Sequence, residues 1–254
     1  MWNPFQTEET ARAYSTARPD YHALAQDIVA RTIELDGRLP VALDIGAGTG
    51  MATRALRDLA DVVVGVDAAA AMLAAAAPAA GVSYVHARAE QLPLRTGSAD
   101  LAVVAAAFHW FDQAAMLSET RRVLRPGRWL AVYTDYFSGE LAGFPGFMDW
   151  LRETYWPSYP APRRQPFLDE EAVVAAGFEL IGDETFTHEV RLGREQLGDY
   201  LLTQSNATAA IDQGRIERDV LRAWLHSEFA GLLPPGPSLG AAFGGRVWTS
   251  KALG

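Results

Sequence analysis

Short apolar runs alternate with segments of helical hydrophobic spacing over the first half of the chain. Continuous apolar runs are typical of strands buried on both faces of a parallel sheet. Strands are expected at residues 41–45, 61–67, 82–87, 100–105 and 129–133. Helices are expected at 21–35, at about 49–59, in the alanine-rich segment around residue 72, and at 113–124. This alternation predicts an α/β fold, with a doubly wound, Rossmann-like, mostly parallel seven-stranded sheet.

The pattern changes after residue 133, where aromatic residues and prolines crowd the segment 136–168. The segment is too long for a turn and too apolar for a linker, so it predicts an inserted helical and aromatic cap. Its side chains would shape an apolar pocket; a small satellite core or a dimer contact are the alternatives. The aromatic residues concerned are Trp150, Tyr155, Trp156 and Tyr159.

Weaker patterns complete the second half of the chain. Helices are expected at 170–176, 196–205 and 213–232, and strands at 178–187 and 245–250. The domain organisation expected is a core with an N-terminal closing segment at 1–135, then cap and substrate-binding elements interleaved with late core strands at 136–240, and a last core strand at 241–254. Both a monomer and a homodimer are compatible with the sequence.

The segment VALDIGAGTG, residues 41–50, reads as a strand followed by a glycine turn. Asp44 stands at the strand end, and glycines follow at 46, 48 and 50, a spacing that differs from the G-x-G-x-x-G of dinucleotide enzymes. A carboxylate there would repel a pyrophosphate, but it suits the ammonium group of an amino acid. The two observations together favour S-adenosylmethionine (SAM), a cationic amino-acid nucleoside, as the ligand.

Composition excludes several other chemistries. The chain has no cysteine, so disulfides, thiolate nucleophiles and cysteine-bound metals are excluded. No histidine pair has the spacing of metal ligands, and we expect no metal. The net charge of −9 argues against a broad nucleic-acid surface. The start shows no signal peptide, and the longest apolar run, at 68–80, is too short to span a membrane, so a cytoplasmic protein without a membrane partner is expected.

Five motifs occur in order across residues 40–134: LDIGAGTG, VGVDAAAAML, ARAEQLPL, DLAVVAAAFHWFD and VLRPGRWLAVY. In this arrangement the chain resembles a class I SAM-dependent methyltransferase of the small-molecule branch, which includes the trans-aconitate type and methyltransferase type 11. The opening segment FQTEETARAYSTARPDY is also similar to the start of these enzymes. Residues 136–240 match only in outline, so the resemblance does not name a substrate.

The resemblance implies roles for individual residues. Asp44 and the turn would hold the methionine part of SAM, and Asp67 would accept the ribose hydroxyls, with capping of the next helix as its alternative role. Residues near the adenine or the methionine side would be Ala68, Met72, Ala89, Glu90 and Ala105, beside the turn residues Gly46, Ala47 and Gly48.

Three further residues are candidates outside the turn. Tyr14 and Arg18 lie in the segment that closes over the cofactor in similar enzymes, where Arg18 would pair with the SAM carboxylate. His109 follows the strand at 100–105, and its ordinary pKa near neutrality would suit a general base. The alternative for His109 is a packed aromatic corner formed by the sequence HWF.

The function expected is methyl transfer to a partly apolar small molecule, at an oxygen, nitrogen, carbon or carboxylate, in natural-product biosynthesis, with S-adenosylhomocysteine as the second product. Three alternatives stay open. The protein could be a SAM-binding regulator or cyclase that transfers no methyl group. It could be an NAD-dependent oxidoreductase, which the glycine spacing disfavours, or a nucleic-acid methyltransferase, which the acidic charge disfavours.

Overall fold

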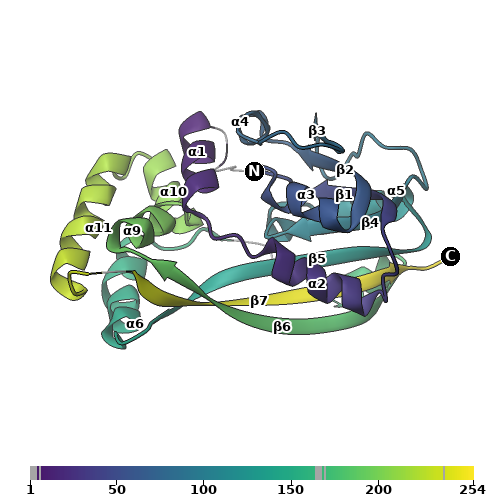
Figure 1. Ribbon diagram of the computed structural model, residues 1–254. Coiled ribbons are helices and arrows are strands. Elements are labelled where there is room, and N and C mark those ends of the chain that lie inside the picture. The colour runs from purple at the N-terminus through teal and green to yellow at the C-terminus, as the bar shows by residue number, and fades with distance from the viewer. Residues whose placement is uncertain (1–4, 6, 164–167, 169, 237) are drawn as a thin grey trace. The chain divides into compact units, whose positions relative to one another are not determined.

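A seven-stranded sheet with strand order β3-β2-β1-β4-β5-β7-β6 organises the protein (Figure 1). The computed structural model describes residues 5, 7–163, 168, 170–236 and 238–254. Its strands are β1 (Leu39–Ile45), β2 (Ala60–Asp67), β3 (Val82–His86), β4 (Ala99–Ala105), β5 (Leu124–Leu141), β6 (Phe178–Leu192) and β7 (Leu239–Ala252). The pairs β1–β2, β1–β4, β2–β3 and β4–β5 are parallel. The predicted α/β fold is confirmed.

The chain divides into two compact units. The core unit comprises Asp20–Asp135, Arg164–Phe186 and Gly245–Gly254, and the helical unit comprises Met1–Pro19, Tyr136–Arg163 and Thr187–Gly244. The first segment of the core unit ends at Asp135. However, the first 19 residues are grouped with the helical unit, whereas we expected them with the core. Residues 164–167 of the aromatic segment lie outside the described residues.

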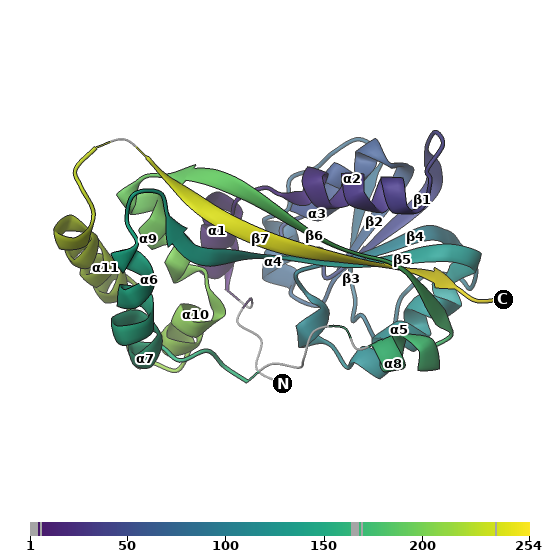
Figure 2. The ribbon, with the colours of Figure 1, turned by 90° about the horizontal axis from the view of Figure 1, so that it is seen from below.

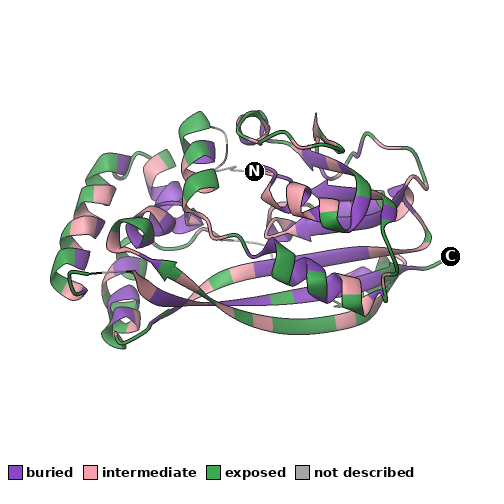
Figure 3. Cartoon of the chain, viewed as in Figure 1, coloured by how far each residue is buried: buried purple, intermediate pink, exposed green. Residues whose placement is uncertain are grey.

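Side chains of the core unit alternate between two hydrophobic layers, because successive residues of a strand point to opposite faces. Leu43 and Ile45 belong to the layer that contains Met116 and Leu117 of α5 (Gln113–Val123). Ala42 belongs to the layer that contains α2 (His22–Thr32). Figure 2 shows α2 and α5 on opposite faces of the sheet. The central strand β4 is buried along nearly its whole length, as Figure 3 shows by colour.

The remaining helices of the core unit are short. They are α3 (Met51–Ala55), the 3₁₀ turns η1 (Leu56–Asp58) and η2 (Phe108–Trp110), α4 (Ala70–Ala74) and α8 (Glu170–Ala175). The alanine-rich segment at 68–80 forms only the short helix α4, although its composition favours a longer one. Alanine has high helix propensity but little surface to bury, and Met72 is the buried side chain of α4.

The helical unit contains α1 (Glu8–Ala17), α6 (Gly146–Trp150), the π-helical segment η3 (Leu151–Tyr155), α7 (Trp156–Ser158), α9 (Arg194–Leu202), α10 (Ser205–Asp212) and α11 (Arg218–Leu232). The aromatic residues expected in the cap mostly build the core of this unit. Trp150 and Tyr155 are buried and their rings stack, and Tyr159 packs against the same cluster. Trp156 is the exception, with 42% of its surface exposed. The satellite-core alternative therefore accounts for Trp150 and Tyr155.

We expect Tyr155→Phe to lower the free energy of unfolding by about 1 kcal/mol, the usual net value of one hydrogen bond. The Tyr155 hydroxyl, which is fully buried, donates to the Leu201 carbonyl at 3.0 Å and so joins η3 to α9. Urea unfolding followed by circular dichroism measures the effect. Tyr136→Phe is the matched control, because Tyr136 is 57% exposed. Equal effects of the two substitutions would contradict this role for Tyr155.

None of the helices in the described part of the chain combines the length and the apolarity that crossing a membrane requires.

Candidate cofactor-binding site

The glycine turn after β1 has a backbone that other residues rarely adopt. Gly46, Gly48 and Gly50 have φ angles of +80°, +55° and +76°. At Gly46 there is also no room for a side chain, because a Cβ atom would lie 2.6 Å from the Cβ of Ala107. Glycine at this position lets the chain pass close to the segment that follows β4.

The turn is fastened to the end of the neighbouring strand. The backbone N–H groups of Gly46 and Ala47 both donate to the Val66 carbonyl, at 2.8 and 3.0 Å. The parallel register pairs Asp44 with Gly65 and Ile45 with Val66, so the carboxyl ends of β1 and β2 lie together. Ligands of open α/β sheets bind beyond these strand ends.

Asp67, the last residue of β2, ties the glycine turn to the start of the next helix. One carboxylate oxygen accepts the Gly48 N–H at 2.7 Å, and the other accepts the Ala69 N–H at 2.7 Å. Burial raises the pKa of Asp67, against the lowering effect of these two N–H groups. The alternative role as the helix cap is wrong, because the N-cap residue of α4 is Ala69 and no side chain caps this helix. Each oxygen keeps a further lone pair that a ligand hydroxyl could use.

Asp44 is fully buried below the turn. Its Oδ2 accepts the Thr53 hydroxyl at 2.6 Å, whereas its Oδ1 has no hydrogen-bond partner among the described residues. Burial raises the pKa of Asp44 to about 7, the Thr53 hydrogen bond opposes this, and the nearby Asp67 charge adds to it. A buried carboxylate oxygen without a partner is costly, and a positively charged ligand group would satisfy it.

A buried polar cluster lies next to Asp44 on the same face of the sheet. Tyr133 accepts from Gln26 at 3.3 Å and contacts Nδ1 of His22 at 3.2 Å. Burial raises the pKa of Tyr133, and the Asp44 charge raises it further. Burial lowers the pKa of His22 to about 4. Sequence reasoning did not single out these residues or Thr53, because each reads as an ordinary helix or strand residue until the fold pairs them.

The residues expected near adenine follow the ends of two neighbouring strands, β2 and β3. Met72 is buried, and its Cε would lie 3.2 Å from a Cβ at Gly48, so this side chain packs against the turn. Ala68 is exposed, whereas Ala89 is buried in the core layer. Glu90 accepts the Asp112 N–H at 3.1 Å and pairs with Arg88 at 3.3 Å. Their contacts with adenine stay predictions.

The chain turns sharply at the end of β4. Ala105 is half-buried there, and Ala106 has a φ of +50°, in the left-handed region that alanine rarely adopts. The Ala106 N–H donates to the Tyr133 carbonyl at 2.8 Å and holds this conformation. His109 follows in η2, buried, with its ring centroid 4.8 Å from that of Trp110. This contact fits the packed aromatic corner, and the role as a general base stays a prediction.

Tyr14 and Arg18 belong to the helical unit, on and directly after α1. The Arg18 Nη2 donates to the Thr203 carbonyl at 2.9 Å. Its guanidinium lies over the rings of Tyr14 and Tyr200, at 4.9 and 5.2 Å from their centroids. Arg18 is thus held in place within its own unit, and its pairing with the SAM carboxylate stays a prediction.

Across the residues that the structure describes, no group of three or more histidine, aspartate or glutamate side chains is arranged to hold a metal ion.

The sequence and the fold are similar to those of known proteins. A family model described as a methyltransferase domain matches residues 43–132. A protein of Dictyostelium discoideum named as a methyltransferase is 27% identical over 218 residues, which are 83% of this chain and 80% of that protein. A malonyl-[acyl-carrier protein] O-methyltransferase of Enterobacter lignolyticus is 31% identical over 188 residues, 71% of each chain.

A solved structure of a type II methyltransferase from Anaeromyxobacter dehalogenans has the same fold, with a TM-score of 0.67 over 100% of this chain and 99% of that one. Its sequence is 23% identical, so this similarity concerns the fold alone. The sequence relatives assign the class. The chain belongs to the class I SAM-dependent methyltransferase family.

Proposed function

We propose that this methyltransferase binds SAM at the glycine turn and methylates a small molecule. The observation that carries the proposal is the pair of carboxylates at neighbouring strand ends. Asp44 is fully buried with one oxygen unpartnered among the described residues, which suits the ammonium group, and Asp67 joins the turn to the next helix beside the expected ribose position. Bound SAM supplies a methyl group that its positively charged sulfur already activates.

The chain's own part in this reaction is to bind and orient. Gly46, Gly48 and Gly50 let the backbone approach the cofactor, and Asp44 and Asp67 fix its two ends. Orientation of an acceptor behind the methyl group can supply about 7–11 kcal/mol of the rate enhancement. A carboxylate acceptor needs no base, whereas a hydroxyl acceptor would use His109 to take up its proton.

A carboxylate oxygen is the acceptor atom that we favour. The Enterobacter lignolyticus relative is named as an O-methyltransferase of a malonyl group, and such a group carries a free carboxylate. The chain's net charge of −9 supports a small molecule over a nucleic acid as the acceptor. Action in natural-product biosynthesis, the cytoplasmic location, and a monomeric or homodimeric state stay predictions.

Transfer of an isotope-labelled methyl group tests the proposal. The protein is incubated with methyl-labelled SAM and a small-molecule extract, and mass spectrometry follows label and S-adenosylhomocysteine. We expect both a labelled small molecule and S-adenosylhomocysteine. SAM binding without either product would favour the regulator or cyclase alternative. Binding of NADH in place of SAM, measured by fluorescence, would favour an oxidoreductase.

A further inference from the structure

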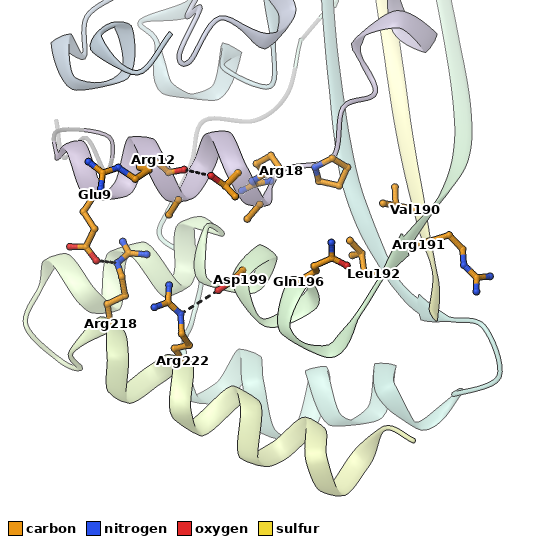
Figure 4. Close-up of a pocket in the computed structure, with 14 residues that line it drawn as sticks. Glu9, Arg12, Arg18, Val190, Arg191, Leu192, Gln196, Asp199, Arg218 and Arg222 are labelled. Carbon is orange, nitrogen blue, oxygen red and sulfur yellow. Dashed lines mark hydrogen bonds and ion pairs between the residues drawn. The ribbon is translucent and has the colours of Figure 1, made fainter. Parts of the chain in front are cut away.

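A pocket of about 490 Å³ lies entirely within the helical unit (Figure 4). Its walls come from α1, α9, α11 and the end of β6. One part of the lining is apolar and includes Ala13, Ala17 and Leu192. This volume is within the range of pockets that hold small organic ligands.

The pocket concentrates positive charge in an acidic protein. Arg12, Arg18, Arg218 and Arg222 line it, against the two carboxylates of Glu9 and Asp199. Arg191 also belongs to the lining, but Figure 4 shows that it points away from the others, and it donates to the Ser238 carbonyl at 2.8 Å. With a net charge of −9 over the whole chain, a local excess of arginines is a specific feature of this surface.

Arg218 is the buried member of this group, with 8% of its surface exposed. Its Nε lies 2.8 Å from the Glu9 carboxylate, and its Nη2 donates to the Thr10 hydroxyl at 3.3 Å. Its Nη1 is buried and has no hydrogen-bond partner among the described residues. A buried guanidinium is stabilised best by a carboxylate that engages two of its nitrogens, so Arg218 is incompletely satisfied.

Glu9 is a weak partner for a buried charge, because its side chain is 70% exposed. Two nearby arginines differ in their contacts, since Arg222 is paired with carboxylates and Arg12 is not. Arg12 makes no side-chain hydrogen bond or ion pair that the structure records within its described ranges, and Arg222 lies at 3.3 and 3.4 Å from Asp199 and Asp219. Figure 4 shows Arg218 extending from α11 toward Glu9 on α1, on the side of the pocket where Arg12 lies.

We propose that this pocket binds a small carboxylate ligand, with Arg218 as its main partner, Arg12 and Arg222 as flanking cations, and the apolar wall against the rest of the ligand. Glu9 occupies the position that the ligand's carboxylate would take at Arg218 and is displaced when the ligand binds. The Glu9–Arg218 pair shows that a carboxylate fits at this guanidinium. The proposal stands on the helical unit alone and does not depend on methyl transfer.

The probe is 4-phenylbutyrate, and its neutral isostere 4-phenylbutyramide is the control ligand. Binding to the full chain is measured by chemical-shift titration with ¹⁵N-labelled protein, including the arginine Nε–H signals. We expect the carboxylate to bind at least about tenfold more tightly than the amide, since a hydrogen bond to a charged group contributes more than a neutral one.

Four variants separate a ligand site from a structural contact. We expect Glu9→Gln to tighten binding of 4-phenylbutyrate about threefold or more, because the internal competitor loses its charge. Arg218→Gln should weaken binding about tenfold or more, and Arg12→Gln should weaken it by a smaller factor. The matched control is Arg152→Gln, since Arg152 is an exposed arginine of the same unit outside the pocket, and it should change binding less than about twofold.

The decisive variant is Glu9→Gln, which leaves Arg218 in place. If Arg218 only fastens α1 to α11, this substitution lowers the unfolding temperature and leaves the affinity for 4-phenylbutyrate unchanged or weaker, and the proposal fails. Equal affinity for the acid and the amide also overturns it. Asp67→Ala, in the core unit, should leave binding of 4-phenylbutyrate unchanged, so failure of the SAM site and failure of this pocket are distinguishable.

Discussion

Replacing Asp67 with alanine should weaken the binding of SAM by about a hundredfold. Hydrogen bonds to a charged group contribute about 1.5–3 kcal/mol each, and the proposed role gives this carboxylate both ribose hydroxyls. The substitution also removes the acceptors of the Gly48 and Ala69 N–H groups, so the turn loses two fixed points. Isothermal titration calorimetry with SAM and with S-adenosylhomocysteine measures the loss.

Two further variants serve as comparisons for Asp67→Ala. Asp67→Asn keeps an acceptor for one N–H group but no charge, and we expect it to weaken binding by about tenfold. Asp61→Ala removes an exposed carboxylate from the same strand, so it should leave the affinity unchanged. If Asp67→Ala binds SAM as tightly as the unaltered protein does, Asp67 does not hold the ribose.

The affinity for SAM should fall about tenfold or more between about pH 7.5 and about pH 5.5, because the pKa of Asp44 in the free protein is about 7. The ammonium group of SAM pairs with the ionised carboxylate of Asp44, and protonation below this pKa removes the negative charge of that carboxylate. Calorimetric titration across this pH range measures the slope. Asp44→Asn, which can still accept the Thr53 hydroxyl, should bind weakly and without this slope. An affinity for SAM that is constant over the range would contradict an ammonium contact at Asp44.

The same pKa has an opposite consequence for the stability of the protein without its cofactor. The folded state holds the Asp44 proton more tightly than the unfolded chain, in which an aspartate has its ordinary pKa of about 3.9. The contribution of Asp44 to the free energy of unfolding is therefore fully present below about pH 4 and is lost as the pH rises through about 7. Comparison of the unfolding of the unaltered protein and Asp44→Asn over this range isolates it.

The sequence predicted the central part of the fold well, because apolar strands and their spacing are local signals. The strands around Asp44 and Asp67 lie within a residue or two of the expected bounds, and the glycine turn is where the motif placed it. The helix α10 was missed. Its sequence, SNATAAID, is small and polar and gives no apolar periodicity, yet six of its eight residues are buried in the helical unit.

The partners of the site residues were less predictable than their positions. Asp44 and Thr53 are nine residues apart, and only the turn between strand and helix brings the hydroxyl to the carboxylate. Tyr133 and Gln26 are 107 residues apart, so their contact depends on the packing of α2 on the sheet. The local sequence of α1 does not indicate that this helix belongs to the helical unit, because the grouping depends on contacts with distant residues such as Arg218.

The neutral polar cluster beside Asp44 has a consequence for selectivity. His22 stays uncharged down to about pH 4, and burial raises the pKa of Tyr133, so neither counters the negative charge at Asp44 near neutrality. No ion pair to Asp44 occurs within the described chain. Above about pH 7 the protein thus holds an anion below its glycine turn that has no ion-pair partner among the described residues, and this arrangement favours a ligand that carries a positive group.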